Sequence, residues 1–266
     1  MGIIKSKLRS DSYTPVVTVR PAASNSELRF GIIRLSIGES YENDEQNERA
    51  ILLISGSVWF EWDEHRVLGT RLLWWKESGY CLHVPAGMRI KITGEADKSE
   101  LLFYATPNEN PFCSHLYYPE EFFVVEQAKG ILGGAMERIN RNIISRSTEA
   151  SSHLILAECQ SKPGRWCGFP DHFHPQPEIY YYKFYPADGF ALQRLGGNVY
   201  VVEDGDTVVI TNSQIHPNCT SPDCLMNYVW CICDDPENPY RPYFSMEHTW
   251  VPGCWVSYKE KMEMPP

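Results

Sequence analysis

Short runs of β-branched and aromatic residues, separated by Gly, Pro and Asn, make up most of the chain. In the first half the runs lie at 14–20, 28–35, 50–54, 57–62, 80–84, 89–93 and 101–105, and in the second at 153–159, 179–185, 190–195, 198–203, 206–211 and 226–233. Runs of this length and composition predict strands, and strands at this spacing predict an all-β sandwich or barrel. The pattern leaves open whether part of 120–142 is helical.

Composition and charge narrow the class of protein. A chain of 266 residues with 43% hydrophobic content suits one large or two ordinary globular domains. The net charge of −10 argues against a nucleic-acid partner, and no apolar stretch approaches membrane-spanning length. Nine cysteines without a secretory leader predict reduced thiols in a cytoplasmic protein.

The first candidate chemistry is the pair His172 and His174, followed by Glu178. Residues two apart on a strand point to the same face, and the proline-rich connection 175–177 lets the carboxylate open the next strand beside them. Two imidazoles and one carboxylate suit a borderline divalent cation. Two exposed loop histidines near a surface glutamate are the alternative, and the fixed spacing in a β context disfavours it.

A second motif runs from Gly205 to His216. Together the two stretches resemble the paired motifs of the cupin superfamily, HxHxxxE and GxxxxxPxGxxH, with Thr211 and Ser213 where that family prefers Pro and Gly. The resemblance implies that His216 completes a four-ligand site for one divalent metal ion. Zinc is favoured, and manganese, iron and nickel stay open.

The first half resembles the same plan without the metal. Residues 53–58 resemble the cupin turn between two strands, and 85–87 keep the PxG motif, with Ile90 where the metal histidine would fall. No histidine occurs in 42–48, and His83 is expected to be a core or surface residue. The resemblance implies a bicupin, two cupin β-barrels (double-stranded β-helices) in one chain. We expect an N-terminal domain at 1–125 without metal ligands and a C-terminal domain at 126–266 with the metal site.

Further motifs in the second half narrow the family. They are Gly164, Trp166 and Pro170 before the histidines, Glu178 to Tyr181 after them, then Gly189, Phe190, Gln193 and Arg194, and finally Glu247, His248 and Trp250. These residues resemble the 5-deoxy-glucuronate isomerase family of inositol catabolism. The resemblance implies a metal-dependent aldose–ketose isomerase that interconverts 5-deoxy-glucuronate and 2-deoxy-5-keto-gluconate. The stretch around Trp230 departs from the family pattern.

Strand parity suggests which residues serve the reaction. Tyr180 and Tyr182 share the face of the metal-binding carboxylate, where they donate to sugar hydroxyls, relay a proton or simply fill the core. Gln193 and Arg194 alternate, so only one can face the pocket. Arg194 would bind the substrate carboxylate, whereas Gln193 would bind a hydroxyl or a metal-bound water. His248 is a candidate at the pocket mouth.

The expected partner is a small-molecule sugar acid, with no nucleic acid and no membrane, and a homo-oligomer is left open. Two other classes also stay open. An iron-dependent cupin dioxygenase can use the same three histidines and one glutamate, and a non-catalytic sugar-binding cupin would need no chemistry at all. Metal content and oxygen uptake separate these classes.

Overall fold

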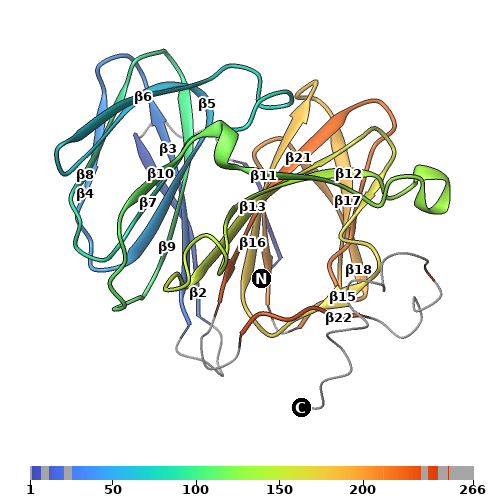
Figure 1. Ribbon diagram of the computed structural model, residues 1–266. Helices are drawn as coiled ribbons and strands as arrows, with labels where there is room; N and C mark the ends of the chain where they lie inside the picture. The colour runs from blue at the N-terminus through green and yellow to red at the C-terminus, as the bar shows by residue number, and fades with distance from the viewer. Residues whose placement is uncertain are drawn as a thin grey trace.

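The computed structural model describes residues 2–6, 12–20, 26–211, 213–234, 239–244 and 251. Within these ranges the regular structure is β-strand apart from two 3₁₀ turns, so the expected all-β class is confirmed (Figure 1). The strands of the first part are β1 (Ile3–Ile4), β2 (Tyr13–Val19), β3 (Leu28–Leu35), β4 (Ser40–Asn43), β5 (Glu48–Trp62), β6 (His65–Arg71), β7 (Cys81–Val84), β8 (Ile90–Gly94), β9 (Ser99–Thr106) and β10 (His115–Tyr117). None of the described helices is long and apolar enough to cross a membrane.

The remaining elements begin with the turn η1 (Pro119–Glu121). They continue with β11 (Phe123–Gln127), η2 (Ile131–Gly134), β12 (Arg138–Ile144), β13 (Leu154–Ser161), β14 (Trp166–Cys167), β15 (His172–Phe173), β16 (Glu178–Tyr185), β17 (Phe190–Leu195), β18 (Asn198–Glu203), β19 (Thr207–Ile210), β20 (Asn218–Thr220), β21 (Leu225–Cys233) and β22 (Tyr243–Phe244). The open question about 120–142 is therefore answered by two strands and two 3₁₀ turns.

The N-terminal half is built around β5, which belongs to two sheets at once. Its first part pairs with β7 and β9, and its second part pairs with β6 and β8. The turn expected at 53–58 is therefore wrong, because the chain stays in one strand of 15 residues. Gly56, at φ +101°, bends that strand where Ser99 leaves no room for a side chain, and the register shifts between Leu53 and Ser55.

The C-terminal half contains a seven-stranded sheet, in the order β1-β19-β16-β21-β13-β12-β11, and a four-stranded sheet, in the order β14-β20-β17-β18. All pairings are antiparallel. The large sheet takes β1 from the start of the chain, and the division expected at 125/126 falls inside β11.

Three apolar cores follow from strand alternation. On β9, Leu101 and Phe103 face the interior of the N-terminal half, while Leu102 and Tyr104 face the other half. On β16, Ile179 and Tyr181 face the N-terminal half, while Tyr180, Tyr182 and Phe184 face the interior of the C-terminal half. The two large sheets therefore pack face to face, and each half also keeps a core of its own.

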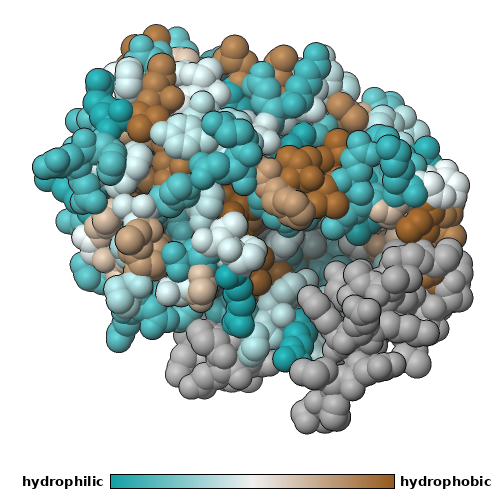
Figure 2. Space-filling model, in the orientation of Figure 1, coloured by the Kyte–Doolittle hydropathy of each residue, from teal (hydrophilic) through white to brown (hydrophobic). Residues whose placement is uncertain are grey.

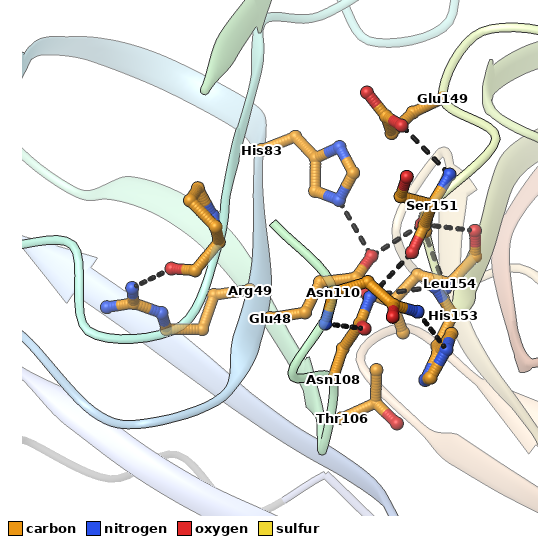
Figure 3. A network of polar contacts seen from close by, with 12 residues as sticks. Glu48, Arg49, His83, Thr106, Asn108, Asn110, Glu149, Ser151, His153 and Leu154 are labelled. Atoms are coloured by element: carbon orange, nitrogen blue, oxygen red, sulfur yellow. Dashed lines mark hydrogen bonds and ion pairs between the residues drawn. The ribbon is translucent and has the colours of Figure 1, made fainter. Parts of the chain in front are cut away.

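Buried polar contacts also join the halves. Arg71 and Glu158 form a two-point ion pair, at 2.6 and 2.9 Å, with both side chains fully buried. A second cluster surrounds buried Glu48, whose carboxylate accepts hydrogen bonds from His83, from Asn108 and from the backbone N–H of His153 (Figure 3). His83 is thus a core residue, as expected, and its partner Glu48 ties the N-terminal sheet to the start of the second half.

The outer surface is mainly polar on the face drawn in Figure 2. An apolar patch interrupts it over β11, where Phe123 and Val124 are exposed. The next residues of β11, from Val125 to Gln127, line the cavity of the C-terminal half. This strand therefore contributes both to the surface and to the cavity wall.

Candidate metal centre

The candidate ligands lie on two segments of the C-terminal half, one that runs from β15 to the start of β16 and one that follows β19. Strand β15 carries His172 and ends one residue before His174, and β16 begins at Glu178. Strand β16 pairs with β19 in a register that sets Glu178 opposite Ile210, and the turn after β19 delivers His216. Residues that are separated in the sequence thus come together beside β16 and β19.

Three of the four residues form a tight group. The ligand atoms of His174, Glu178 and His216 lie within 4.8 Å of one another, and all three residues are buried. His172 is half-buried, with its ring centre 4.6 Å from that of His216 and 6.4 Å from that of His174. The described residues therefore contain a His-Glu-His group that could hold a metal ion, with a third imidazole beside it.

Backbone carbonyls fix the orientation of every imidazole. Because a carbonyl oxygen can only accept, each Nδ1 must carry the proton and donate it. His172 donates to Gly168 and Pro170, both at 3.1 Å, His174 donates to Gln176 at 3.1 Å, and His216 donates to Gln214 at 2.7 Å. In a neutral ring the opposite nitrogen, Nε2, then presents a lone pair. This arrangement of outer partners is typical of histidines that bind a metal through Nε2.

The electrostatics of the cluster favour a cation. Nε2 of His216 is buried and makes no hydrogen bond, although it lies 3.2 Å from Oε2 of Glu178. Burial raises the pKa of Glu178, but the neighbouring imidazoles of His174 and His216, whose Nε2 atoms lie 3.1 and 3.2 Å from its Oε2, outweigh that effect and lower it to about 2. Burial and the two neighbouring histidines lower the pKa of His172 to about 3. A buried carboxylate and two imidazoles whose ligand atoms lie within 4.8 Å of one another fit a bound divalent ion.

A cavity of about 430 Å³ opens onto the cluster. Its lining includes Glu178 and His172 at one end and, on the same face of β16, Tyr180. Burial and the negative charge of Glu178 raise the pKa of Tyr180 well above its usual value, so its phenol stays protonated at neutral pH. The cavity is therefore large enough for a small ligand and has a hydrogen-bond donor beside the candidate ligands.

The structure places Tyr182 and Gln193 behind the site. The Tyr182 hydroxyl donates to Oε1 of Gln193, and Asn218 donates to the same hydroxyl at 3.1 Å. The side-chain amide of Gln193 donates to the carbonyl of His216 at 2.9 Å and to that of Pro217 at 3.3 Å. These side chains do not line the cavity, and they hold the turn that carries His216.

Of the alternating pair, Gln193 points inward and Arg194 points outward. The side chain of Arg194 is 43% exposed, and it is paired with Asp171 and with the carbonyl of Gly196. It does not line the cavity. His248, the candidate at the pocket mouth, lies outside the described residues.

Sequence reasoning missed the far wall of the cavity. Arg138, Asn140 and Asn142 alternate along β12 and share its cavity-facing side, and Trp230 on β21 lies on the same face of this sheet. The amides are linked in series, because Trp230 donates to Asn140 at 3.3 Å and Asn140 donates to Asn142 at 2.8 Å. The alternation within 138–142 was the available signal, but that stretch could not be assigned to a strand.

Solved structures place the fold in a known class. An IolB-like protein from Salmonella typhimurium superposes with a TM-score of 0.83 at 22% identity, covering 94% of this chain and 99% of that one. A cupin 2 conserved barrel domain protein from Leptotrichia buccalis superposes with a TM-score of 0.52 at 12% identity, covering 87% of this chain and 92% of that one. The fold is therefore all-β and similar to that of cupin-type barrels, as expected.

The family follows from the sequence comparison. The model of the KduI/IolB family matches residues 3–251, so the chain belongs to that family. A 5-deoxy-glucuronate isomerase of Geobacillus kaustophilus is 25% identical over an aligned length of 281, and the alignment covers 96% of this chain and 99% of the relative. The isomerase of the same name from Bacillus licheniformis is 25% identical over an aligned length of 250, which covers 86% of this chain and 90% of that relative. The family resemblance read from the motifs is confirmed.

Proposed function

We propose that this chain is a metal-dependent aldose–ketose isomerase that interconverts 5-deoxy-glucuronate and 2-deoxy-5-keto-gluconate, as in inositol catabolism. The ligands would be His172, His174, Glu178 and His216, with zinc as the favoured ion. One observation carries the proposal: three imidazoles, each with its Nδ1 proton held by a backbone carbonyl, surround a buried carboxylate at one end of a cavity. The names of the relatives supply the reaction.

The reaction moves a carbonyl from C1 to C2 of the sugar acid, so a proton leaves C2 and another arrives at C1. A divalent ion held here would polarise the two substrate oxygens and make the C2 proton more acidic. Tyr180 lies at the wall beside Glu178, and its protonated phenol would donate to one of these oxygens. Gln193 and Tyr182 would keep His216 in position from behind.

The cavity also offers a place for the anionic end of the substrate. Arg138 contributes the guanidinium of the β12 wall, and Asn140 and Asn142 add amides on the same face. Asn140 donates one N–H to Asn142, and Asn142 donates one to the carbonyl of Phe123 at 3.2 Å, whereas a carboxamide carries two. A wall with one cation and spare N–H groups suits a carboxylate. We assign substrate anchoring to this wall in place of Arg194.

The test is metal content and isomerase activity of the purified protein before and after chelation. We expect one divalent ion per chain, loss of activity with a chelator, and recovery when zinc or another divalent ion is returned. His174→Ala should lose the ion and the activity together, whereas His115→Ala, an exposed histidine of the N-terminal half, should lose neither. Full activity of the enzyme after the metal has been removed by the chelator would contradict the proposed role of the metal.

The same preparation separates the other two classes. A dioxygenase would consume oxygen with the sugar acid, and its activity would stop under argon. A sugar-binding protein would bind 5-deoxy-glucuronate without converting it. The isomerase proposal expects equal turnover with and without oxygen.

A further inference from the structure

Two cysteines lie together in the wall of the C-terminal half. Sγ of Cys159, on β13, is 3.7 Å from Sγ of Cys167, on β14, and both residues are buried. All eight cysteines among the described residues are free thiols. Among the described cysteines, Cys159 and Cys167 are the pair whose sulfur atoms are in contact.

The pair can be reached and is chemically unequal. Cys159 lines the cavity, so a small oxidant can meet it there, whereas Cys167 is not among the lining residues. Burial opposes ionisation of Cys159, but the hydrogen bond with Cys167 and the positive charge of Arg138 outweigh burial and lower the pKa of Cys159 to about 7. Burial and the neighbouring sulfur raise the pKa of Cys167 well above its usual value. One thiol is therefore suited to attack and the other to resolve.

The backbone of Cys167 connects directly to the candidate metal ligands. The next residue, Gly168, supplies one of the carbonyls that accept the Nδ1 proton of His172. Cys167 itself pairs in the sheet with Asn218, two residues after His216. A shift of β14 therefore changes the support of two histidines at once.

We propose that Cys159 and Cys167 are a reversible disulfide modification site, and that forming the bond weakens metal binding at the neighbouring histidines. A disulfide needs its sulfurs about 2 Å apart, so they must approach by more than 1 Å from their present separation. Strand β13 lies inside the seven-stranded sheet, between β12 and β21, whereas β14 has two residues at the edge of the small sheet. We therefore expect β14, and not β13, to move when the disulfide forms.

The chemistry balances with a peroxide as oxidant. The Cys159 thiolate attacks one oxygen of hydrogen peroxide, the O–O bond breaks, and a sulfenic acid and hydroxide form. The Cys167 sulfur then attacks the sulfenic sulfur, the S–S bond forms, and water leaves with the thiol proton. Two thiols lose two electrons and two protons in total, and the peroxide becomes two waters. A dithiol reductant reverses the change by thiol–disulfide exchange.

The first experiment maps the bond in the full-length protein. The reduced protein is treated with a small excess of hydrogen peroxide, alkylated, digested and analysed by mass spectrometry. We expect a Cys159–Cys167 cross-linked peptide, absent from Cys159→Ala and Cys167→Ala and still present in Cys113→Ser, which removes an exposed thiol. Oxidation of Cys113 with no bond between Cys159 and Cys167 would overturn the proposal. The peptide map of the oxidised wild-type protein alone shows whether the disulfide forms, so the test does not depend on whether the variants fold.

The second experiment measures zinc affinity by competition with a chromophoric chelator. We expect the oxidised protein to bind zinc about ten-fold more weakly than the reduced protein, because outer partners of metal-binding histidines contribute on that scale. Reduction should restore the affinity, and Cys159→Ala should be insensitive to peroxide. Equal affinity in both states would overturn the coupling. Failure of the reduced protein to bind zinc at all would count against the proposed metal site, while the peptide map would still decide the disulfide.

Discussion

At the scale of single residues, the site depends on backbone acceptors that the motif does not name. The histidines at 172 and 174 and the carboxylate at 178 were predicted from spacing, because the periodicity of strands determines which side chains meet. The carbonyls of Gly168, Gln176 and Gln214 that hold the three rings could not be predicted. They belong to irregular turns, whose direction depends on the packed structure and not on a repeat.

Gln193 tests this outer support. Gln193→Ala removes no candidate ligand but leaves the carbonyl of His216 and the hydroxyl of Tyr182 without their partner. We expect metal affinity to fall about ten-fold, with the free energy of unfolding lower by about 1–3 kcal/mol. Competition titration and urea unfolding measure the two effects. Unchanged metal affinity in a variant that unfolds earlier would reduce Gln193 to a structural role.

Arg138 and Arg194 are the two candidates for binding the substrate carboxylate, and kinetics can distinguish them. Arg138 lies on the cavity wall, and Arg194 is paired with Asp171 outside it. Arg138→Gln should raise KM about ten-fold or more, with a smaller effect on kcat, because carboxylate binding is shared by substrate and transition state. Arg194→Gln should change KM less. Steady-state kinetics with 5-deoxy-glucuronate rank the two variants, and the reverse ranking would return the anchoring role to Arg194.

At the scale of elements, alternation predicted most strands but not how they combine. The runs at 28–35 and 101–105 became β3 and β9 within two residues at each end, because both have apolar residues on both faces. The runs at 50–54 and 57–62 became one strand, since a glycine that can bend inside a strand reads like a turn in sequence. The cavity wall at 138–142 was missed because its apolar positions are few.

The bend in β5 can be tested at Gly56. Alanine there is strained at φ +101°, and its Cβ would lie 2.6 Å from Cα of Ser99, which is backbone that cannot rotate away. We expect Gly56→Ala to lower the free energy of unfolding by about 2–4 kcal/mol. Gly38→Ala is the matched control, because Gly38 has φ +78° but nothing within 4 Å of its Cβ position. It should cost only about 1 kcal/mol. Equal losses in the two variants would show that the contact with Ser99 is irrelevant.

At the scale of the whole molecule, the two halves share an apolar core. Apolar residues of β3 and β9 pack against those of β16 and β21, and β1 crosses into the far sheet. The sequence predicted two related barrels, because each half carries its own run of strands. It could not predict the shared interface, since a strand buried on both faces shows no alternation to reveal its second partner.

The ion pair between Arg71 and Glu158 tests how strongly the halves are coupled. Glu158→Ala leaves a guanidinium buried among the carbonyls of Leu53, Trp74 and Glu77 without its counter-charge. Breaking a buried pair in this way costs roughly 3–5 kcal/mol, whereas Arg89→Ala, which breaks an exposed pair with Glu42, should leave the unfolding midpoint unchanged.

The shape of the unfolding curve then decides between one cooperative unit and two. Because the apolar core and the ion pair both span the interface, we expect a single urea transition for the wild type and for Glu158→Ala, shifted to lower urea in the variant. Tryptophan fluorescence and far-ultraviolet circular dichroism should report the same midpoint. If Glu158→Ala instead split the curve, with one half unfolding first and the metal retained, the halves would be separable units. The shared core would then contribute less to stability than its burial implies.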